Sequence, residues 1–230
     1  MVYDFNAFLI ALRNAGFSGA AGGGDDGVFN LFRHVWDLGD GSGLPWHTDD
    51  PDTDPWEWRM RVLNECDDIA YAKVFLRKAG YITREWYAYF IAARRGTQPF
   101  EDAYQSGTAS RGEKRIYDTI TDYGKLPVHE IKRLGRFSRE DSARFERALT
   151  DLQMKLYITM CGGERKVSKK GEAYGWFSTV FCKTEDFWPP DVFNKAATLT
   201  RAEATEVLSA RILALHPEAD KRKILKVVAG

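Results

Sequence analysis

Tryptophans, an arginine and carboxylates are concentrated between Leu44 and Arg61. An indole ring can stack on a nucleobase that has left a duplex, and an arginine beside it can hold a phosphate. Carboxylates can stabilise the positive charge that develops on a sugar when its glycosidic bond breaks. One hypothesis for this segment is therefore a base pocket, lined by Trp46, Trp56, Trp58 and Arg59.

Three carboxylates are candidates for the catalytic group of such a pocket: Asp54, Glu57 and Glu85. Nothing in the sequence selects among them. The competing interpretation is structural: the tryptophans fill a core, the carboxylates cap turns, and Arg59 pairs with one of them.

Metal binding is the next possibility. Asp50, Asp52 and Asp54 have the spacing that opens a calcium loop, but Pro55 stands at the sixth position and Arg61 at the twelfth, where such a loop needs Gly and Glu. This excludes an EF-hand. A looser cation site that includes His47 stays open beside the simpler interpretation of solvated turn carboxylates. The four histidines, His34, His47, His129 and His216, show no ligand spacing, so neither a metal nor a cofactor is expected.

The elements around this segment can be predicted from periodicity. Asp4 can cap a helix that ends near Gly16 and buries Phe5, Phe8, Leu9 and Leu12. Three prolines and no periodicity predict a loop over residues 44–61. Weak alternation predicts strands at 70–76 and 81–83, joined by a turn at 78–80, and Thr83 can cap a helix over 85–94.

The signals are sharper after residue 110. Ser110 and Glu113 form a capping box, so a helix should begin there and end at Gly124. A short extended entry at 126–127 leads to a second helix over 128–134 and a third that ends near Met154. Strands are expected at 156–160 and 176–182, with a turn at Gly162 and Gly163. This order of helices and strands is that of a winged helix-turn-helix domain.

In that domain the third helix enters the major groove and the wing, the loop between the two strands, contacts the backbone or the minor groove. Projection of the third helix at 100° per residue places Arg144 and Arg147 opposite its apolar stripe. The wing adds further positive charge. Duplex DNA is therefore the expected partner, bound by Arg144, Arg147, Arg165, Lys166, Lys169 and Lys170. The alternative is a module for protein contacts, whose basic residues are a solvated face.

The last part of the chain is predicted to be helical. Thr200 and Glu203 form a second capping box, and a helix continues to about Leu215, whereas residues 221–226 are interpreted as a basic tail. We expect three parts: an N-terminal helical, winged-helix-like region (1–108), a winged helix-turn-helix domain (109–190) and a C-terminal helical segment (191–230). The expected fold is mainly α with small β wings (α+β), in a tandem winged helix-turn-helix architecture.

The amino-acid composition limits the classes of protein to which the chain can belong. Hydrophobic residues make up 44% and charged residues 29% of the 230 residues, which excludes a disordered chain. The 33 basic and 33 acidic residues cancel overall, but nine acids face two bases in 20–60, and 16 bases face 11 acids in 110–185. Three cysteines without C-x-x-C spacing, no secretory signal and no apolar run of membrane length predict a cytoplasmic protein. The oligomeric state is not indicated.

Two stretches resemble a known family. Leu149-Thr-Asp-Leu-Gln-Met-Lys-Leu-Tyr-Ile, following Lys125-Leu-Pro-Val-His-Glu-Ile-Lys, is similar to the winged-helix repeats of the AlkZ-type bacterial DNA glycosylases. Tyr81-Ile-Thr-x-Glu-x-Tyr-x-Tyr-Phe90 is similar to another segment of these enzymes. Nearly the whole chain resembles a shorter, AlkZ-related group of bacterial proteins.

The resemblance implies tandem winged helices that form a concave DNA-facing surface and the release of alkylated or crosslinked bases. The family's paired-glutamine motif is missing, because the glutamines are only Gln98, Gln105 and Gln153. The expected function is thus a winged-helix DNA-binding protein related to base-excision DNA glycosylases, acting on damaged or alkylated DNA. The alternative is a non-enzymatic winged-helix regulator or protein-interaction module, so whether the chain is an enzyme stays open.

Overall fold

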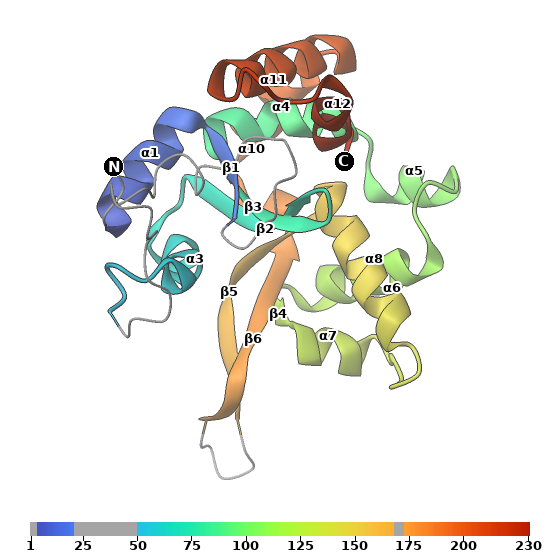
Figure 1. Cartoon of the computed structure of the whole chain (residues 1–230). Helices are drawn as coiled ribbons and strands as arrows, with labels where there is room; N and C mark the ends of the chain where they lie inside the picture. The colour runs from blue at the N-terminus through green and yellow to red at the C-terminus, as the bar shows by residue number, and fades with distance from the viewer. Residues whose placement is uncertain (1–3, 21–49, 168–172) are drawn as a thin grey trace. The chain divides into compact units, whose positions relative to one another are not determined.

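The computed structural model describes residues 4–20, 50–167 and 173–230, with side chains outside 166–177. It divides into two compact units. Unit 1 comprises Met1–Thr97 and Pro190–Gly230, and unit 2 comprises Gln98–Pro189. Figure 1 labels their helices and strands.

Unit 1 begins with helix α1 (Phe5–Ala15), followed by strand β1 (Phe17–Gly19). The carboxylate of Asp4 accepts a hydrogen bond of 2.8 Å from the amide of Ala7, which satisfies one of the free donors of the first turn. Helix α1 buries the predicted apolar residues, Phe5, Phe8, Leu9 and Leu12, together with Ala15. The predicted helix is confirmed.

Helix α3 (Pro55–Glu65) corrects the prediction of a loop through residue 61. Asp54 is its N-cap and accepts a hydrogen bond of 2.8 Å from the amide of Trp56. Pro55 stands at the first helical position, where its missing N–H costs nothing and its fixed φ favours the helix. An Asp-Pro pair is thus a helix start signal here, although prolines in an aperiodic stretch predict a loop.

Strands β2 (Ile69–Phe75) and β3 (Lys78–Thr83) form a hairpin, and β1 pairs with the other edge of β3. All the pairings are antiparallel, in the order β1-β3-β2. The turn lies at Leu76 and Arg77, which have φ values of 49° and 66°, and not at 78–80 as predicted. A two-residue turn of type I′ needs positive φ at both central residues, and this chain meets that need without Gly or Asn.

Helix α4 (Arg84–Arg94) is followed, after unit 2, by three helices that complete unit 1. These are α10 (Pro190–Ala197), α11 (Arg201–Leu215) and α12 (Lys221–Ala229), and each packs against α4 (Figure 1). The capping box at Thr200 and Glu203 is confirmed. The predicted tail at 221–226 is wrong, because Asp220 caps α12 and Ile224, Val227 and Val228 are buried.

Unit 2 contains helices α5 (Phe100–Gln105), α6 (Arg111–Tyr123), α7 (Val128–Leu134) and α8 (Ser142–Met154), with the short strand β4 (Leu126–Pro127) between α6 and α7. The predicted capping box begins α6: Ser110 Oγ accepts from the amide of Glu113, and Glu113 accepts from the amide of Ser110. Helix α8 packs against α6.

Strands β5 (Ile158–Val167) and β6 (Ala173–Lys183) form a long antiparallel hairpin (Figure 1). The short helix α9 (Thr184–Phe187) follows β6. Strand β4 pairs with β6. Strand β5 continues through Gly162 and Gly163, so the turn predicted there is wrong. The glycines instead adjoin an irregularity between Met160 and Gly162, where β5 has one residue more than its partner strand.

The two units share a pattern of strand pairing. In unit 1, β1 follows α1 and pairs with the second strand of the β2–β3 hairpin. In unit 2, β4 follows α6 and pairs with the second strand of the β5–β6 hairpin. The fold class is α+β, as predicted. None of the helices in the described ranges is both long enough and apolar enough to cross a bilayer.

Candidate nucleic-acid interface and a charged cleft

A cleft of about 770 Å³ lies in unit 2 between the start of α6 and one face of α8. Both arginines predicted by helical projection, Arg144 and Arg147, are exposed on that face and line the cleft. Thr150, three residues after Arg147, is buried and donates to the carbonyl of Glu146.

Two further arginines, Arg111 and Arg115, line the cleft from α6, and neither was predicted from the sequence. Arg115 is fixed: its guanidinium donates to the carbonyl oxygens of Gly135 and Arg136 and lies 4.0 Å from the centre of the Phe137 ring. Arg111 is exposed and has no hydrogen-bond or ion-pair partner among the described residues. The signal that could have found Arg111 is the capping box, which places it in the first turn of α6.

The acidic residues of the cleft are already engaged. Glu113 lies 2.6 Å from the Nζ of Lys155, and Asp151 lies 3.8 Å from Arg147. Hydrogen bonds from the amide and hydroxyl of Ser138 lower the pKa of Asp141. Arg111 and Arg144 therefore keep positive charge that no hydrogen-bonded carboxylate in the described structure neutralises.

The backbone adds to this charge. The amides of Arg111 and Gly112 are in the first turn of α6, and no acceptor for them is found in the part of the chain that the structure describes. A helix N-terminus carries about half a positive charge and favours anions. The arrangement is suited to bind phosphate groups.

The structure tests the predicted wing contacts only in part. Arg165 is exposed on β5, whereas Lys166 lies on β5 at a position whose side chain is not described. Lys169 and Lys170 lie outside the described residues. Their predicted contact with DNA stays a prediction.

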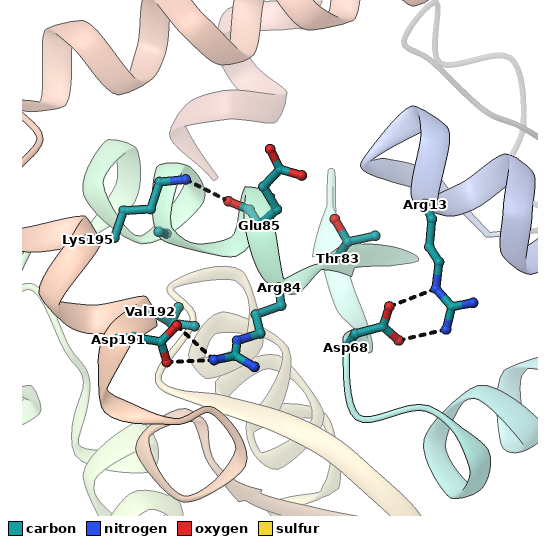
Figure 2. A pocket seen from close by; sticks show the side chains of 9 residues that line it. Arg13, Asp68, Thr83, Arg84, Glu85, Asp191, Val192 and Lys195 are labelled. Atoms are coloured by element: carbon teal, nitrogen blue, oxygen red, sulfur yellow. Dashed lines mark hydrogen bonds and ion pairs between the residues drawn. The ribbon is translucent and has the colours of Figure 1, made fainter.

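A second cleft, of about 420 Å³, lies in unit 1 and is lined by Glu85 (Figure 2). Two ion pairs border it: Arg13 donates to Asp68 at 2.7 and 3.0 Å, and Arg84 donates to both oxygens of Asp191 at 2.8 Å. The hydrogen bond from Arg13 lowers the pKa of Asp68.

Glu85 itself is exposed at the first turn of α4. Figure 2 shows its carboxylate apart from the two ion pairs, and the described residues provide it with no hydrogen-bond donor. Lys195 lies 3.5 Å from the backbone carbonyl of Glu85 and over the ring of Tyr89. Of the predicted carboxylates, Glu85 thus lines a cleft beside three cations.

The other two carboxylates have different surroundings. Asp54 is 3% exposed and is occupied as the N-cap of α3. Glu57 is exposed in the first turn of the same helix. Asp50 and Asp52 bind within their own turn and to Arg61, respectively, and His47 lies outside the described residues. Among the residues described, no three potential ligands are grouped as a metal site requires.

The tryptophans predicted to line the base pocket differ in their exposure to solvent. Trp58 is fully buried, stacks on Phe8 at 5.0 Å and donates to the carbonyl of Asp52, so it is a core residue. Trp56 is 42% exposed and carries the guanidinium of Arg59 at 3.5 Å from its ring centre. Trp46 lies outside the described residues. In this conformation Trp56 is accessible for stacking on a nucleobase, whereas Trp58 is not.

Comparison with known proteins identifies a family for this chain. No curated protein and no solved structure matches the chain. The model of one family, described as AlkZ related, matches residues 4–229. Because this match spans almost every residue of both units, the chain belongs to the AlkZ-related family.

Proposed function

We propose that the protein binds duplex DNA through the arginine-lined cleft of unit 2, and that each unit is a variant of the winged helix. The shared strand pairing of the two units supports the second part. In unit 2 the order α6, β4, α7, α8, β5, β6 is that of a winged helix, in which the third helix enters the major groove. That helix is α8.

The observation that carries the proposal is the position of Arg144 and Arg147 on α8. They are three residues apart, exposed, and on the face that also borders Arg111 across the cleft. A helix of 13 residues is about 20 Å long and fits a major groove. Arginine binds either phosphate oxygens or the O6 and N7 of guanine through two donors.

Membership of the AlkZ-related family favours DNA over other polyanions, since the resemblance to the AlkZ-type DNA glycosylases implies action on DNA. The proposed activity is therefore the recognition of damaged or alkylated duplexes. A regulator or a protein-interaction module with the same fold is the alternative, and it would differ in the first experiment below.

Binding can be measured by fluorescence anisotropy of a labelled duplex over a range of salt concentrations. The double variant Arg144→Ala/Arg147→Ala should raise the Kd at least tenfold at low salt. The salt dependence should become shallower, because each lost phosphate contact removes about 0.9 from the slope of log K against log salt. Arg222→Ala, at an exposed arginine of α12, is the matched control and should change neither value.

Arg111→Ala tests the α6 side of the cleft separately and should weaken binding in the same direction. Failure of the wild-type protein to bind duplex DNA at low ionic strength would contradict the proposal and favour the protein-interaction module. Equal losses for Arg144→Ala/Arg147→Ala and Arg222→Ala would show a diffuse charge effect instead of a site.

A second function, base release, is favoured by the surroundings of Glu85. Its exposed carboxylate borders a cleft with Arg13, Arg84 and Lys195, so it can face a developing positive charge on a sugar while these cations face the adjacent phosphates. Glu85→Gln should abolish release of an alkylated base from a duplex while keeping the wild-type melting temperature and DNA affinity. Glu57→Gln is the matched control on α3 and should retain activity. If the wild-type protein binds DNA but releases no base, the protein is a binder without this activity.

A further inference from the structure

Two of the three cysteines meet in the β5–β6 ladder of unit 2. In its register Thr159 faces Cys182, Met160 faces Phe181, and Gly162 faces Val180. Cys161 is consequently the extra residue of a β-bulge, one position from the residue that pairs with Phe181. The side chain of Cys161 lies next to that of Cys182 across the ladder. The hydrogen bond between the two thiols shows this proximity.

The two thiols are not equivalent. Cys182 is fully buried, whereas Cys161 is partly exposed to solvent. The hydrogen bond from Cys182 lowers the pKa of Cys161, to which the positive charge of Lys125 adds, and the same bond together with burial raises the pKa of Cys182. Cys161 is therefore the accessible nucleophile, and Cys182 is the shielded thiol behind it.

A third residue makes this place unusual. Thr159 is fully buried directly opposite Cys182, and its hydroxyl has no hydrogen-bond partner within the described structure. Side chains of directly opposed residues in an antiparallel pair lie on the same face, about 5 Å apart at Cβ. An unsatisfied buried hydroxyl costs free energy, so Thr159 leaves an unpaired polar group beside the buried sulfur of Cys182 in the described structure.

We propose that Cys161 and Cys182 form a redox-active pair, which a peroxide converts into an intramolecular disulfide. The thiolate of Cys161 attacks one peroxide oxygen, the O–O bond breaks, and the leaving hydroxide takes a proton to become water. This leaves a sulfenic acid on Cys161. Cys182 loses its proton as its sulfur attacks that of Cys161, the S–O bond breaks, and a second water leaves. Two thiols are oxidised by two electrons, and one peroxide is reduced.

The disulfide would cross-link the two strands at the bulge. A bulge is a local irregularity of the ladder, and a covalent bond there fixes the register of β5 against β6. The hairpin continues from this point to Val167 and Ala173. The disulfide would therefore restrict changes in the twist of its outer part. The pair does not depend on any role in DNA binding.

The experiment exposes the full chain to a small excess of hydrogen peroxide and measures intact mass and tryptic peptides without reduction. The wild type should lose two hydrogens in mass, yield one peptide that joins Cys161 to Cys182, and regain its mass with dithiothreitol. Cys66→Ser, at the cysteine of unit 1, is the control and should react as the wild type does. Cys182→Ser should stop at the sulfenic acid, which dimedone labels at Cys161.

Cys182 is buried, so the melting temperature of Cys182→Ser is compared with that of the wild type to check that the variant is folded. Cys161→Ser changes the partly exposed position and tests the proposal independently. Cys161→Ser should form no intramolecular disulfide and leave Cys182 unlabelled. A cross-link that contains Cys66, a disulfide between two chains, or oxidation to sulfinic acid without any Cys161–Cys182 peptide in the wild type would each overturn the proposal.

Discussion

The Nζ atom of Lys155 donates a hydrogen bond of 2.6 Å to the Oε1 atom of Glu113. It also donates to the carbonyl of Thr108 at 2.7 Å. The other carboxylate oxygen of Glu113 accepts from the amide of Ser110. The end of α8 is thus tied to the capping box of α6, and this contact sets the distance between the two helices that form the arginine-lined cleft.

Lys155→Met should destabilise unit 2. The Glu113 side chain is only 3% exposed, so removal of Lys155 leaves a buried carboxylate with one oxygen unsatisfied. We expect a loss of about 1–3 kcal/mol in the free energy of unfolding, measured by urea denaturation. Arg133→Met is the control, since its pair with Glu130 is exposed and should contribute less than about 1 kcal/mol. Equal losses in both variants would contradict the structural role of Lys155.

Gly16→Ala should destabilise unit 1 more than Gly96→Ala does. Gly16 ends α1 with a φ of 91°, and a Cβ there would lie 2.3 Å from the indole ring of Trp86. Gly96 has a φ of 60° with no heavy atom within 4 Å of its Cβ position, so its substitution costs only the left-handed conformation, about 1–2 kcal/mol.

The two glycine variants share the penalty for positive φ, and their difference therefore reports the contact with Trp86. Chemical denaturation monitored by circular dichroism measures it. Equal costs would show that Trp86 moves away freely. The backbone of Gly16 is held in place, because its carbonyl accepts from the amide and the hydroxyl of Thr83.

The pKa of Asp68 should rise when Arg13 is replaced by alanine. The hydrogen bond from Arg13 holds this pKa below its ordinary value of 3.8. A lowered folded-state pKa means that the pair contributes stability above pH 3.8, and that this contribution is lost as the pH falls through the lowered value. Carboxyl NMR titration of Asp68 measures the shift. Arg84→Ala, which removes the other ion pair of the cleft, should leave the pKa of Asp68 unchanged.

Local rules in the sequence predicted many elements of the fold. The capping boxes at Ser110 and Thr200 and the Asp4 cap mark helix starts, because the hydrogen bonds concerned lie within four residues. The failures occurred where one residue type has two roles. Proline is typical of loops, but Pro55 begins a helix, and Leu76 with Arg77 adopts a turn that usually requires Gly or Asn.

The candidate site was predicted to a smaller extent, since it depends on packing between distant elements. Helical periodicity identified Arg144 and Arg147, which share one helix. Arg111 joins them only because α6 packs against α8, and no local pattern reports that contact. Likewise, Trp56 and Trp58 are two residues apart on α3, so that one is exposed while the other is buried against Phe8.

Arg94 on α4 offers a test of how the last helix is held. Its side chain is buried and donates to three backbone carbonyls, those of Val74 and Val227 at 2.7 Å and that of Val228 at 3.2 Å. Burial lowers the pKa of Arg94 to about 10, so the charge itself is costly there. The compensation is that Val227 and Val228 lie in the last turn of α12, where carbonyls lack partners within the helix and favour a cation.

Arg94→Met should therefore act locally. It removes a costly buried charge, so the free energy of global unfolding should change less than the number of lost hydrogen bonds suggests. The carbonyls of Val227 and Val228 lose their donors, and α12 should fray. Hydrogen exchange followed by mass spectrometry should show faster exchange of the amides in 221–229, with α8 unaffected. Arg222→Met, on the exposed side of α12, should leave exchange at the wild-type rate. If α12 exchanged at the same rate in the wild type and in Arg94→Met, apolar packing of Ile224, Val227 and Val228 would be sufficient to hold the helix without the guanidinium.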